Sequence, residues 1–167
     1  MRIGLLSDTH GWLDPSLPNY FAACDEIWHA GDIGTLAVLE ELEAHKPVRA
    51  VYGNIDGADI RAVVPENQIF RLSGLSVVMT HIGGYPGKYQ ARARALLDEH
   101  RPDLYICGHS HILKVMPDRR RDLLHINPGA SGRHGFHHLR TAVRFSITEG
   151  RVEQLEVIEL GKRGRDQ

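Results

Sequence analysis

The chain has 167 residues, of which 42% are hydrophobic and 25% are charged. These values are those of an ordinary globular protein, so they exclude disordered, collagenous and coiled-coil chains. The 20 Lys and Arg residues against 21 Asp and Glu give a net charge of −1, which offers no basic excess for nucleic acid binding by charge alone.

The N-terminal segment shows no signal for membrane insertion or export. The apolar run after Met1 ends at Ser7, too early for a signal peptide, and no run approaches the roughly 18 residues that cross a bilayer. We therefore predict a cytoplasmic protein that does not contact a membrane. Cys24 and Cys107 lie in apolar surroundings and are predicted to be reduced core thiols.

The first part of the chain alternates short apolar runs with helical stretches, which is typical of βαβ units in a mostly parallel sheet. Strands are predicted over residues 2–6, 26–30, 48–52 and 103–107, with a hairpin over 68–72 and 75–80. Helices are predicted over residues 14–23, 35–45 and 90–100. Asp14 followed by Pro15 resembles the start of the first of these helices.

The last part of the chain contains apolar runs with no helical pattern between them. These runs predict strands over residues 113–116, 123–126, 142–147 and 152–160. Such a series is typical of antiparallel pairing, so we expect it to form a second sheet or to extend the first. We predict one domain over residues 1–160 and a frayed, charged tail over 161–167.

Polar side chains that can bind a metal follow five of the apolar runs, at the point where each run ends. In open α/β sheets the carboxyl ends of the strands meet at one edge, so we expect these side chains to converge in one crevice. The candidate metal ligands are Asp8, His10, Asp32, Asn54, His81, His109 and His111.

The spacing and the chemistry of these residues favour a site for two metal ions. A glycine directly precedes three of the candidates, at Gly31, Gly53 and Gly108, where a side chain would crowd the turn. The full set is too large for one tetrahedral zinc ion and suits two ions that share a carboxylate. Only Asp8 and Asp32 offset the charge of two divalent ions, so the site favours an anionic substrate such as a phosphate ester.

These blocks resemble the five sequence motifs of the calcineurin-like metallophosphoesterases. The blocks are Asp8-x-His10, Gly31-Asp32, Gly53-Asn54, His81 and Gly108-His109-Ser110-His111. The short length and the run Asn127-Pro128-Gly129-Ala130-Ser131 resemble the small single-domain phosphodiesterase branch of bacteria and archaea. The resemblance extends from Met1 to about Ser131.

The resemblance implies a fold, a ligand set and a reaction. The fold is a four-layer αββα sandwich of two mixed sheets flanked by helices. One metal ion is held by Asp8, His10 and His111, and the other by Asn54, His81 and His109. Asp32 bridges the two ions. The reaction is hydrolysis of a small phosphate ester, foremost a phosphodiester, by in-line attack of a metal-bridging hydroxide that Asp32, Asn54 and His81 help to position.

The metal is expected to be manganese, with iron, zinc, nickel or cobalt as alternatives, because mixed nitrogen and oxygen ligands accept all of them. Two divalent ions per chain are expected. The sequence does not identify the natural substrate, the metal used in the cell or whether the chain forms a homo-oligomer.

The sequence departs from the family pattern at Ile55. Many members follow the asparagine ligand with a histidine that stabilises the transition state or protonates the leaving group, but the run here is Gly53-Asn54-Ile55-Asp56. The small branch often lacks this histidine as well. A missing general acid is worth about 10²–10⁴ in rate. We therefore expect aryl or cyclic phosphodiesters, which have acidic leaving groups, to be cleaved faster than alkyl monoesters.

Two residues beside the motifs have a structural and a functional interpretation. His29 lies inside a predicted strand and is interpreted as a plain buried histidine rather than as one that orients a ligand. Asp56 either orients a ligand or forms a turn with Gly57.

Two segments are candidates for substrate contact. Tyr85 lies in the glycine-rich segment 83–87 directly after His81, which we predict to be a specificity loop, and its ring could stack on a base or an aryl group. Arg133 is a candidate contact for a phosphate oxygen, although the histidine-rich segment 133–140 is interpreted first as a solvated loop.

A protein-binding scaffold is the competing interpretation, because the small retromer subunit resembles this fold and has an altered metal site. All the candidate ligand positions carry competent side chains here, which favours the enzyme. A single-metal hydrolase of a non-phosphate bond is the third alternative. Two ions per chain would favour the phosphoesterase, one ion the third alternative, and none the scaffold.

Overall fold

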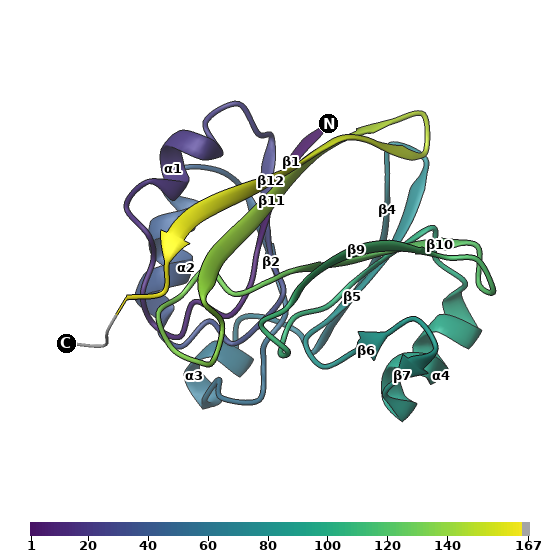
Figure 1. Cartoon of the computed structure of the whole chain (residues 1–167), viewed down its shortest axis with the longest axis horizontal. Coiled ribbons are helices and arrows are strands. Elements are labelled where there is room, and N and C mark those ends of the chain that lie inside the picture. Colours follow the sequence, from purple (N-terminus) through teal and green to yellow (C-terminus); the bar gives the residue numbers. More distant parts are fainter. Residues whose placement is uncertain (165–167) are drawn as a thin grey trace.

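Two five-stranded β-sheets lie at the centre of the computed structural model, which describes residues 1–164 (Figure 1). The first sheet has the order β12-β11-β1-β2-β3. Its strands are β1 (Arg2–Leu6), β2 (Glu26–His29), β3 (Val48–Ala50), β11 (Leu139–Thr148) and β12 (Arg151–Lys162). The second sheet has the order β4-β5-β8-β10-β9. Its strands are β4 (Asn67–Leu72), β5 (Leu75–Thr80), β8 (Leu104–Ile106), β9 (Leu113–Asp118) and β10 (Leu123–Pro128).

Parallel strands occupy the middle of both sheets. In the first sheet β1, β2 and β3 run parallel, and in the second sheet β5, β8 and β10 run parallel. The other strands of the two sheets, β11, β12, β4 and β9, pair antiparallel with their neighbours. The parallel strands of each sheet therefore have their carboxyl ends at a common edge.

The main hydrophobic core lies between the two sheets. Trp28 of β2 is fully buried there, and its ring packs edge-on against Phe70 of β4 and Phe145 of β11, at centroid distances of 5.1 and 5.8 Å. Because Phe70 belongs to the second sheet and Trp28 to the first, this aromatic contact ties the sheets together.

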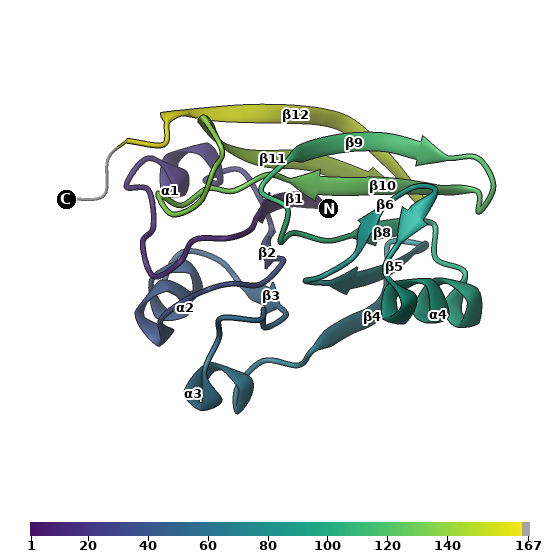
Figure 2. The same ribbon diagram turned by 60° about the horizontal axis from the view of Figure 1, so that its bottom comes forward.

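Helices cover the outer faces of the sheets (Figure 2). They are α1 (Leu17–Tyr20), α2 (Leu36–Glu43), α3 (Ala58–Arg61) and α4 (Ala91–His100). Apolar residues of α1, α2 and α3, such as Leu39 and Ile60, pack with Ile27 of the first sheet. Leu97 of α4 packs with Val78 of the second sheet. The layers thus run helix, sheet, sheet, helix, which confirms the predicted fold class.

Several predicted elements are confirmed with small changes at their ends. The helix predicted over 90–100 is α4, which ends at Arg101 in a left-handed cap with a φ of 44°. The predicted hairpin is β4–β5, in which Ser73 and Gly74 have φ values of 48° and 83°. Two consecutive positive φ angles are typical of the type I′ turn that favours a tight hairpin.

The predicted helix over 14–23 is wrong at both ends, because α1 has only four residues. Asp14 does not cap it. The Oδ1 atom of Asp14 accepts hydrogen bonds from the backbone N–H of Ser16, at 2.8 Å, and from its hydroxyl, at 2.6 Å. The Asp14 carboxylate also pairs with Arg140 of β11. These contacts hold the chain in a turn before the helix starts.

The late strands do not form one sheet of their own. They are antiparallel in pairs, as predicted, but β9 and β10 complete the second sheet whereas β11 and β12 extend the first. β12 continues to Lys162, so the predicted tail is strand at its first two positions. Residues 165–167 of that tail lie outside the described residues.

Some short elements escaped the sequence analysis. The predicted loop over 83–87 contains β6 (Gly84–Tyr85), which pairs with β7 (Lys88–Tyr89). The four-residue helix α3 was also missed, because elements this short show no periodicity. In the part of the chain that the structure describes, no helix is both long and apolar enough to reach across a bilayer.

The position of Trp28 between the sheets predicts a large loss of stability on truncation. Trp28→Ala should lower the free energy of unfolding by about 3–5 kcal/mol, because it removes a large buried side chain and leaves a cavity. Phe136→Ala is the control, since the Phe136 side chain is 100% exposed and its loss should change stability by less than about 0.5 kcal/mol. Urea unfolding measures both. Equal losses in the two variants would contradict this account of the core.

Candidate metal centre

Each candidate ligand lies just beyond the carboxyl end of a parallel strand, and both sheets contribute. The ligands from the first sheet are Asp8 and His10 after β1, Asp32 after β2 and Asn54 after β3. The ligands from the second sheet are His81 after β5, and His109 and His111 after β8. The site is therefore built where the two sheets meet.

The backbone at this edge is strained. Positive φ angles between 48° and 70° occur at Asp8, His10, Asp32, His109 and His111. Residues other than glycine seldom adopt this conformation, and each such residue costs about 1–3 kcal/mol, which the surrounding structure must offset. Such strain clusters at functional sites, where the direction of a side chain matters more than local stability.

The ligand atoms form two adjacent groups. One group is Asp8, His10 and His111, and the other is Asp32, His81 and His109; within each group the atoms lie within 4.8 Å of one another. The Asp32 carboxylate faces both groups, because its Oδ1 lies 3.2 Å from His81 Nε2 and its Oδ2 lies 3.6 Å from His10 Nε2. The Asp32 carboxylate thus lies between the two groups.

Unpartnered polar atoms at the centre of this cluster fit a metal ion. Among residues 1–164, the buried atoms Asp8 Oδ1, His10 Nε2 and His81 Nε2 have no hydrogen-bond partner, although buried polar atoms normally have one. Asp8 Oδ1 lies 3.2 Å from His111 Nε2 and 3.9 Å from the Nε2 atoms of His10 and His81. Ligands about 2.1 Å from a shared ion lie about 3–3.5 Å apart. The donor set therefore fits divalent metal ions.

Hydrogen bonds to the outward-facing atom of a ligand side chain aim its unpartnered atom toward the centre of the cluster. The Nδ1 of His81 donates to the Ala30 carbonyl at 2.7 Å, which leaves the Nε2 lone pair free. The Oδ2 of Asp8 accepts from the Ser7 hydroxyl at 2.6 Å and from the His109 N–H at 3.1 Å, which leaves Oδ1 free. Such hydrogen bonds set the orientation of metal ligands.

His29 is fully buried, as predicted, and both of its ring nitrogens have partners in the turns that carry the candidate ligands. Its Nδ1 accepts the Gly31 N–H at 3.1 Å, and its Nε2 lies 2.9 Å from the hydroxyl of Thr9. The Thr9 hydroxyl donates to the Ile33 carbonyl at 2.8 Å. Burial lowers the pKa of His29 to about 4, so the ring stays neutral. His29 thereby joins the turn after β1 to the turn after β2.

Asp56 orients the ligand turns, which favours the functional interpretation of this residue. Its buried carboxylate accepts three backbone N–H groups, those of Ile33 at 3.1 Å, Gly34 at 2.8 Å and Gly53 at 2.8 Å. Gly53 is packed so closely that an added Cβ would lie 2.0 Å from Asp32 Oδ1. The turns after β2 and β3 can approach each other only because position 53 has no side chain.

Asn127 is a positioning residue that the sequence analysis missed. Its side-chain N–H₂ donates to the Gly108 carbonyl and to the Ser110 hydroxyl, both at 3.0 Å, and its Oδ1 accepts the Gly129 N–H at 3.0 Å. These bonds hold the turn that carries the two histidines after β8. The signal was available, since Asn127 directly follows a buried apolar run, as the candidate ligands do.

The structure places the predicted ligand Asn54 and the predicted substrate contacts Tyr85 and Arg133 in different surroundings. Asn54 is exposed and lines a cavity of about 760 Å³ together with His81. The Lys114 ammonium nitrogen lies over the Tyr85 ring, 4.4 Å from the ring centroid. The Arg133 guanidinium stacks on the ring of Trp12 at 3.8 Å.

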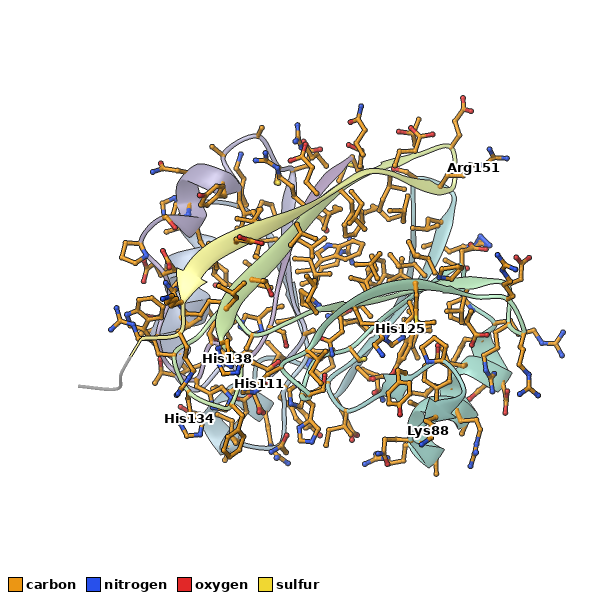
Figure 3. The ribbon with its side chains drawn as sticks, viewed as in Figure 1. Lys88, His111, His125, His134, His138 and Arg151 are labelled. Atoms are coloured by element: carbon orange, nitrogen blue, oxygen red, sulfur yellow. The ribbon has the colours of Figure 1, made fainter. Side chains whose placement is uncertain are left out.

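The histidine-rich segment is not simply a solvated loop. The His134 ring packs on His10 with a centroid distance of 4.8 Å, and the His137 ring contacts His111 at 5.1 Å. His138 is exposed. Figure 3 shows His111, His134 and His138 at the end of β11 away from Arg151. Two of the three loop histidines therefore lie directly against candidate ligands.

The charges of the cluster favour a cation. Burial opposes ionisation of Asp8, but His111, His81 and Ser7 outweigh it, so the pKa of Asp8 is lowered. The pKa of Asp32 is lowered in the same way, chiefly through His81. Burial lowers the pKa of His10, whereas the carboxylates of Asp32 and Asp8 overcome burial and raise the pKa of His81. Two ionised carboxylates thus face the imidazoles of the cluster.

Comparison with known proteins places these features in context. Residues 1–150 match the sequence profile described as the calcineurin-like phosphoesterase superfamily domain. A probable metallophosphoesterase of Methanothermobacter thermautotrophicus is 30% identical over 135 residues, which cover 78% of this chain and 77% of that protein.

Solved structures share the fold over nearly the whole chain. A single mutant of Vps29 from Entamoeba histolytica has a TM-score of 0.74 at 15% identity, covering 95% of this chain and 99% of that one. A structure described as a novel archaeal phosphodiesterase has a TM-score of 0.72 at 23% identity, with the same coverage of 95% and 99%. At these identities the likeness is one of fold.

Metal binding should weaken as the pH falls. A metal at His81 would need an unprotonated Nε2, and the pKa of His81 is raised, so protons should compete with the metal already near and above the ordinary histidine pKa of about 6.5. The affinity for Mn²⁺, measured by calorimetry between about pH 5.5 and 8, should fall by up to about tenfold per pH unit for each competing proton.

The matched variant is His81→Asn, which offers an oxygen ligand that does not titrate. Its affinity should be weaker than that of the wild type but should depend less steeply on pH. If the affinities of the two proteins showed the same dependence on pH, protons would not be competing with the metal for His81.

Proposed function

The chain belongs to the calcineurin-like phosphoesterase superfamily, and from this premise we propose that it is a phosphodiesterase that uses two divalent metal ions per chain. The observation that carries the proposal is the pair of ligand groups with Asp32 between them. One ion would be held by Asp8, His10 and His111, and the other by Asn54, His81 and His109. Asp32 would contact both ions. Manganese is the metal that we expect first, because mixed nitrogen and oxygen ligands accept it.

The ligand set leaves the site suited to an anion. Two divalent ions, when bound, supply a water of lowered pKa and positive charge beside the phosphate oxygens. Asp8 and Asp32 are the carboxylates of the two ligand groups, so they offset only part of that charge. Asn54 and the imidazoles bind without adding negative charge. The protein therefore keeps a positive field where the phosphate would lie.

The cavity beside the site is large enough for a phosphodiester. It has a volume of about 760 Å³ and extends from Asn54 and His81 past Ile82 to Gln90 and Leu96 of the α4 region. This volume lies in the range of small-molecule sites. The cavity therefore offers room next to the candidate ligands for both ester groups of a diester.

Ile55 supports a preference for acidic leaving groups. The backbone N–H of Ile55 donates to Asp32 Oδ1 at 3.1 Å, and its side chain is 46% exposed beside Asn54. The residue thus lies at the site but cannot give a proton to a departing oxygen. An aryl oxide needs such a proton less than an alkoxide does.

A protein-binding scaffold is the second candidate function, and one observation favours it. Large apolar side chains follow the ligands directly and are exposed, with Ile82 at 41% and Ile112 at 61%, and Phe136 in the neighbouring loop is 100% exposed. Exposed apolar residues that gather on one face often mark a protein contact. The two functions differ in metal dependence and turnover, which the following experiments measure.

The first test compares substrates. With Mn²⁺ present, a bis-aryl phosphodiester should be hydrolysed about 10²-fold or more faster than an alkyl monoester, because no general acid stands at position 55. Ile55→His should narrow this gap by raising the rate for the alkyl ester. Ile112→His, the same change after a different ligand, is the control and should leave the ratio unchanged. Equal rates for the two esters in the wild type would contradict the proposed preference.

The second test removes the shared carboxylate. Asp32→Ala should lose both bound ions and lower turnover by about 10³-fold or more, since several kcal/mol of charge stabilisation disappear with the metals. Metal content and hydrolysis rate are measured on the same sample. Asp59→Ala, which removes an exposed carboxylate of α3, is the control. Full activity of Asp32→Ala in metal-free buffer would refute the mechanism, and a wild type without metal or turnover would favour the scaffold.

A further inference from the structure

A second histidine lies directly behind one of the candidate ligands. The Nε2 of His111 faces Asp8 Oδ1 at 3.2 Å, while its Nδ1 lies 3.2 Å from the Nδ1 of His137. The other ring nitrogen of His137, Nε2, lies 2.9 Å from the Gly132 carbonyl oxygen. The two imidazoles therefore form a chain that leads from the ligand cluster to a backbone carbonyl.

The Gly132 carbonyl determines which ring nitrogen of His137 and of His111 carries a proton. A carbonyl oxygen only accepts, so His137 Nε2 must carry the proton and donate it to Gly132. A neutral imidazole has one donor and one acceptor, and the two Nδ1 atoms 3.2 Å apart can share only one proton. His137 Nδ1 is then an acceptor, and the proton between the rings belongs to His111 Nδ1. The lone pair of His111 is left on Nε2.

We infer that His137 is a positioning residue that holds His111 in the tautomer and orientation in which Nε2 binds metal. The inference rests on the proposed metal centre, in which His111 is a ligand. The hydrogen bond at the second ring nitrogen selects the nitrogen of a histidine that binds a metal, and its removal typically weakens metal affinity by about 10–100-fold.

Gly132, whose carbonyl accepts from His137, is itself hydrogen-bonded to Asp8, another candidate ligand of the same group. The Gly132 N–H donates to the Asp8 carbonyl at 3.1 Å, and the Ser131 N–H donates to the Ser7 carbonyl at 3.0 Å. A series of hydrogen bonds thus runs from His111 through His137 and Gly132 to the backbone of Asp8. The direction of the His111 ring is thereby coupled to the position of the Asp8 carboxylate.

The loop backbone is shaped around the contact between the two rings. Gly135 has a φ of +126°, and a Cβ added there would lie 2.2 Å from His111 Nδ1 and 3.2 Å from His137 Nδ1. A side chain at position 135 would displace one of the two rings. On the same loop, His134 packs on His10, so the segment contacts both imidazoles of the first ligand group.

Calorimetric titration with Mn²⁺ tests the inference on the full chain. The wild type should bind two ions. His137→Ala should weaken one of the two affinities by about 10–100-fold and leave the other within about threefold. His137→Asn should recover most of the loss, because its Oδ1 stands at the position of the lost Nδ1 and accepts the same proton. His138→Ala, a change at the exposed neighbouring histidine, is the control and should match the wild type.

A spectroscopic measurement separates positioning from general destabilisation. In the Zn²⁺-loaded protein, the Nδ1 proton of His111 should be hydrogen-bonded and slow to exchange in the NMR spectrum of the wild type and of His137→Asn. It should exchange rapidly in His137→Ala. Thermal unfolding confirms that each variant is folded.

The outcomes distinguish this inference from the proposed function. Unchanged Mn²⁺ affinities in His137→Ala, or an equal loss in His137→Asn, would overturn the role of His137 even if the enzyme hydrolyses diesters. A wild type that binds two ions but hydrolyses no phosphate ester would refute the proposed function, while the affinities of the variants still decide the role of His137. A wild type that binds no ion would overturn both.

Discussion

The carboxylate of Asp32 is the point at which the two halves of the site meet. One of its oxygens faces His81, which follows a strand of the second sheet, and the other faces His10, which follows a strand of the first. Two sheets that face each other can place their strand ends this close only if their relative position is well defined. The buried contact of Trp28 with Phe70 and Phe145 supplies that definition. The core and the proposed chemistry are therefore connected through the position of the sheets.

The turns around Asp32 are strained and are held by hydrogen bonds that do not involve the ligand atoms themselves. His29, Asp56 and Asn127 each satisfy backbone or hydroxyl groups of two different turns. Each positive φ at a residue other than glycine costs about 1–3 kcal/mol, and these buried bonds offset that cost. What they leave without a partner are Asp8 Oδ1 and the inward nitrogens of His10 and His81. The buried hydrogen bonds thus stabilise a strained backbone in which lone pairs point at a common centre, as a bound metal ion requires.

The fold could be predicted well where an element is long or carries a local turn signal. The helix α4 and the hairpin across Ser73 and Gly74 are examples, because their patterns depend on neighbouring residues alone. The prediction failed at α1, where Asp14 is engaged by Ser16 and by Arg140 from a distant strand. It also left open the sheet to which each late strand belongs, since the apolar patterns of β9–β10 and β11–β12 do not specify the neighbouring strand.

The sequence by itself determined the choice of candidate ligands, because these residues follow closely on apolar runs and a strand end is a local feature. Only the tertiary structure decided which atoms face one another and which residues support them. The N–H of His109 reaches the Asp8 carboxylate across 101 positions, and His137 reaches His111 across 26. No periodicity of the chain encodes such pairs. They arise when two sheets pack against each other and bring distant turns within the few ångströms over which hydrogen bonds act.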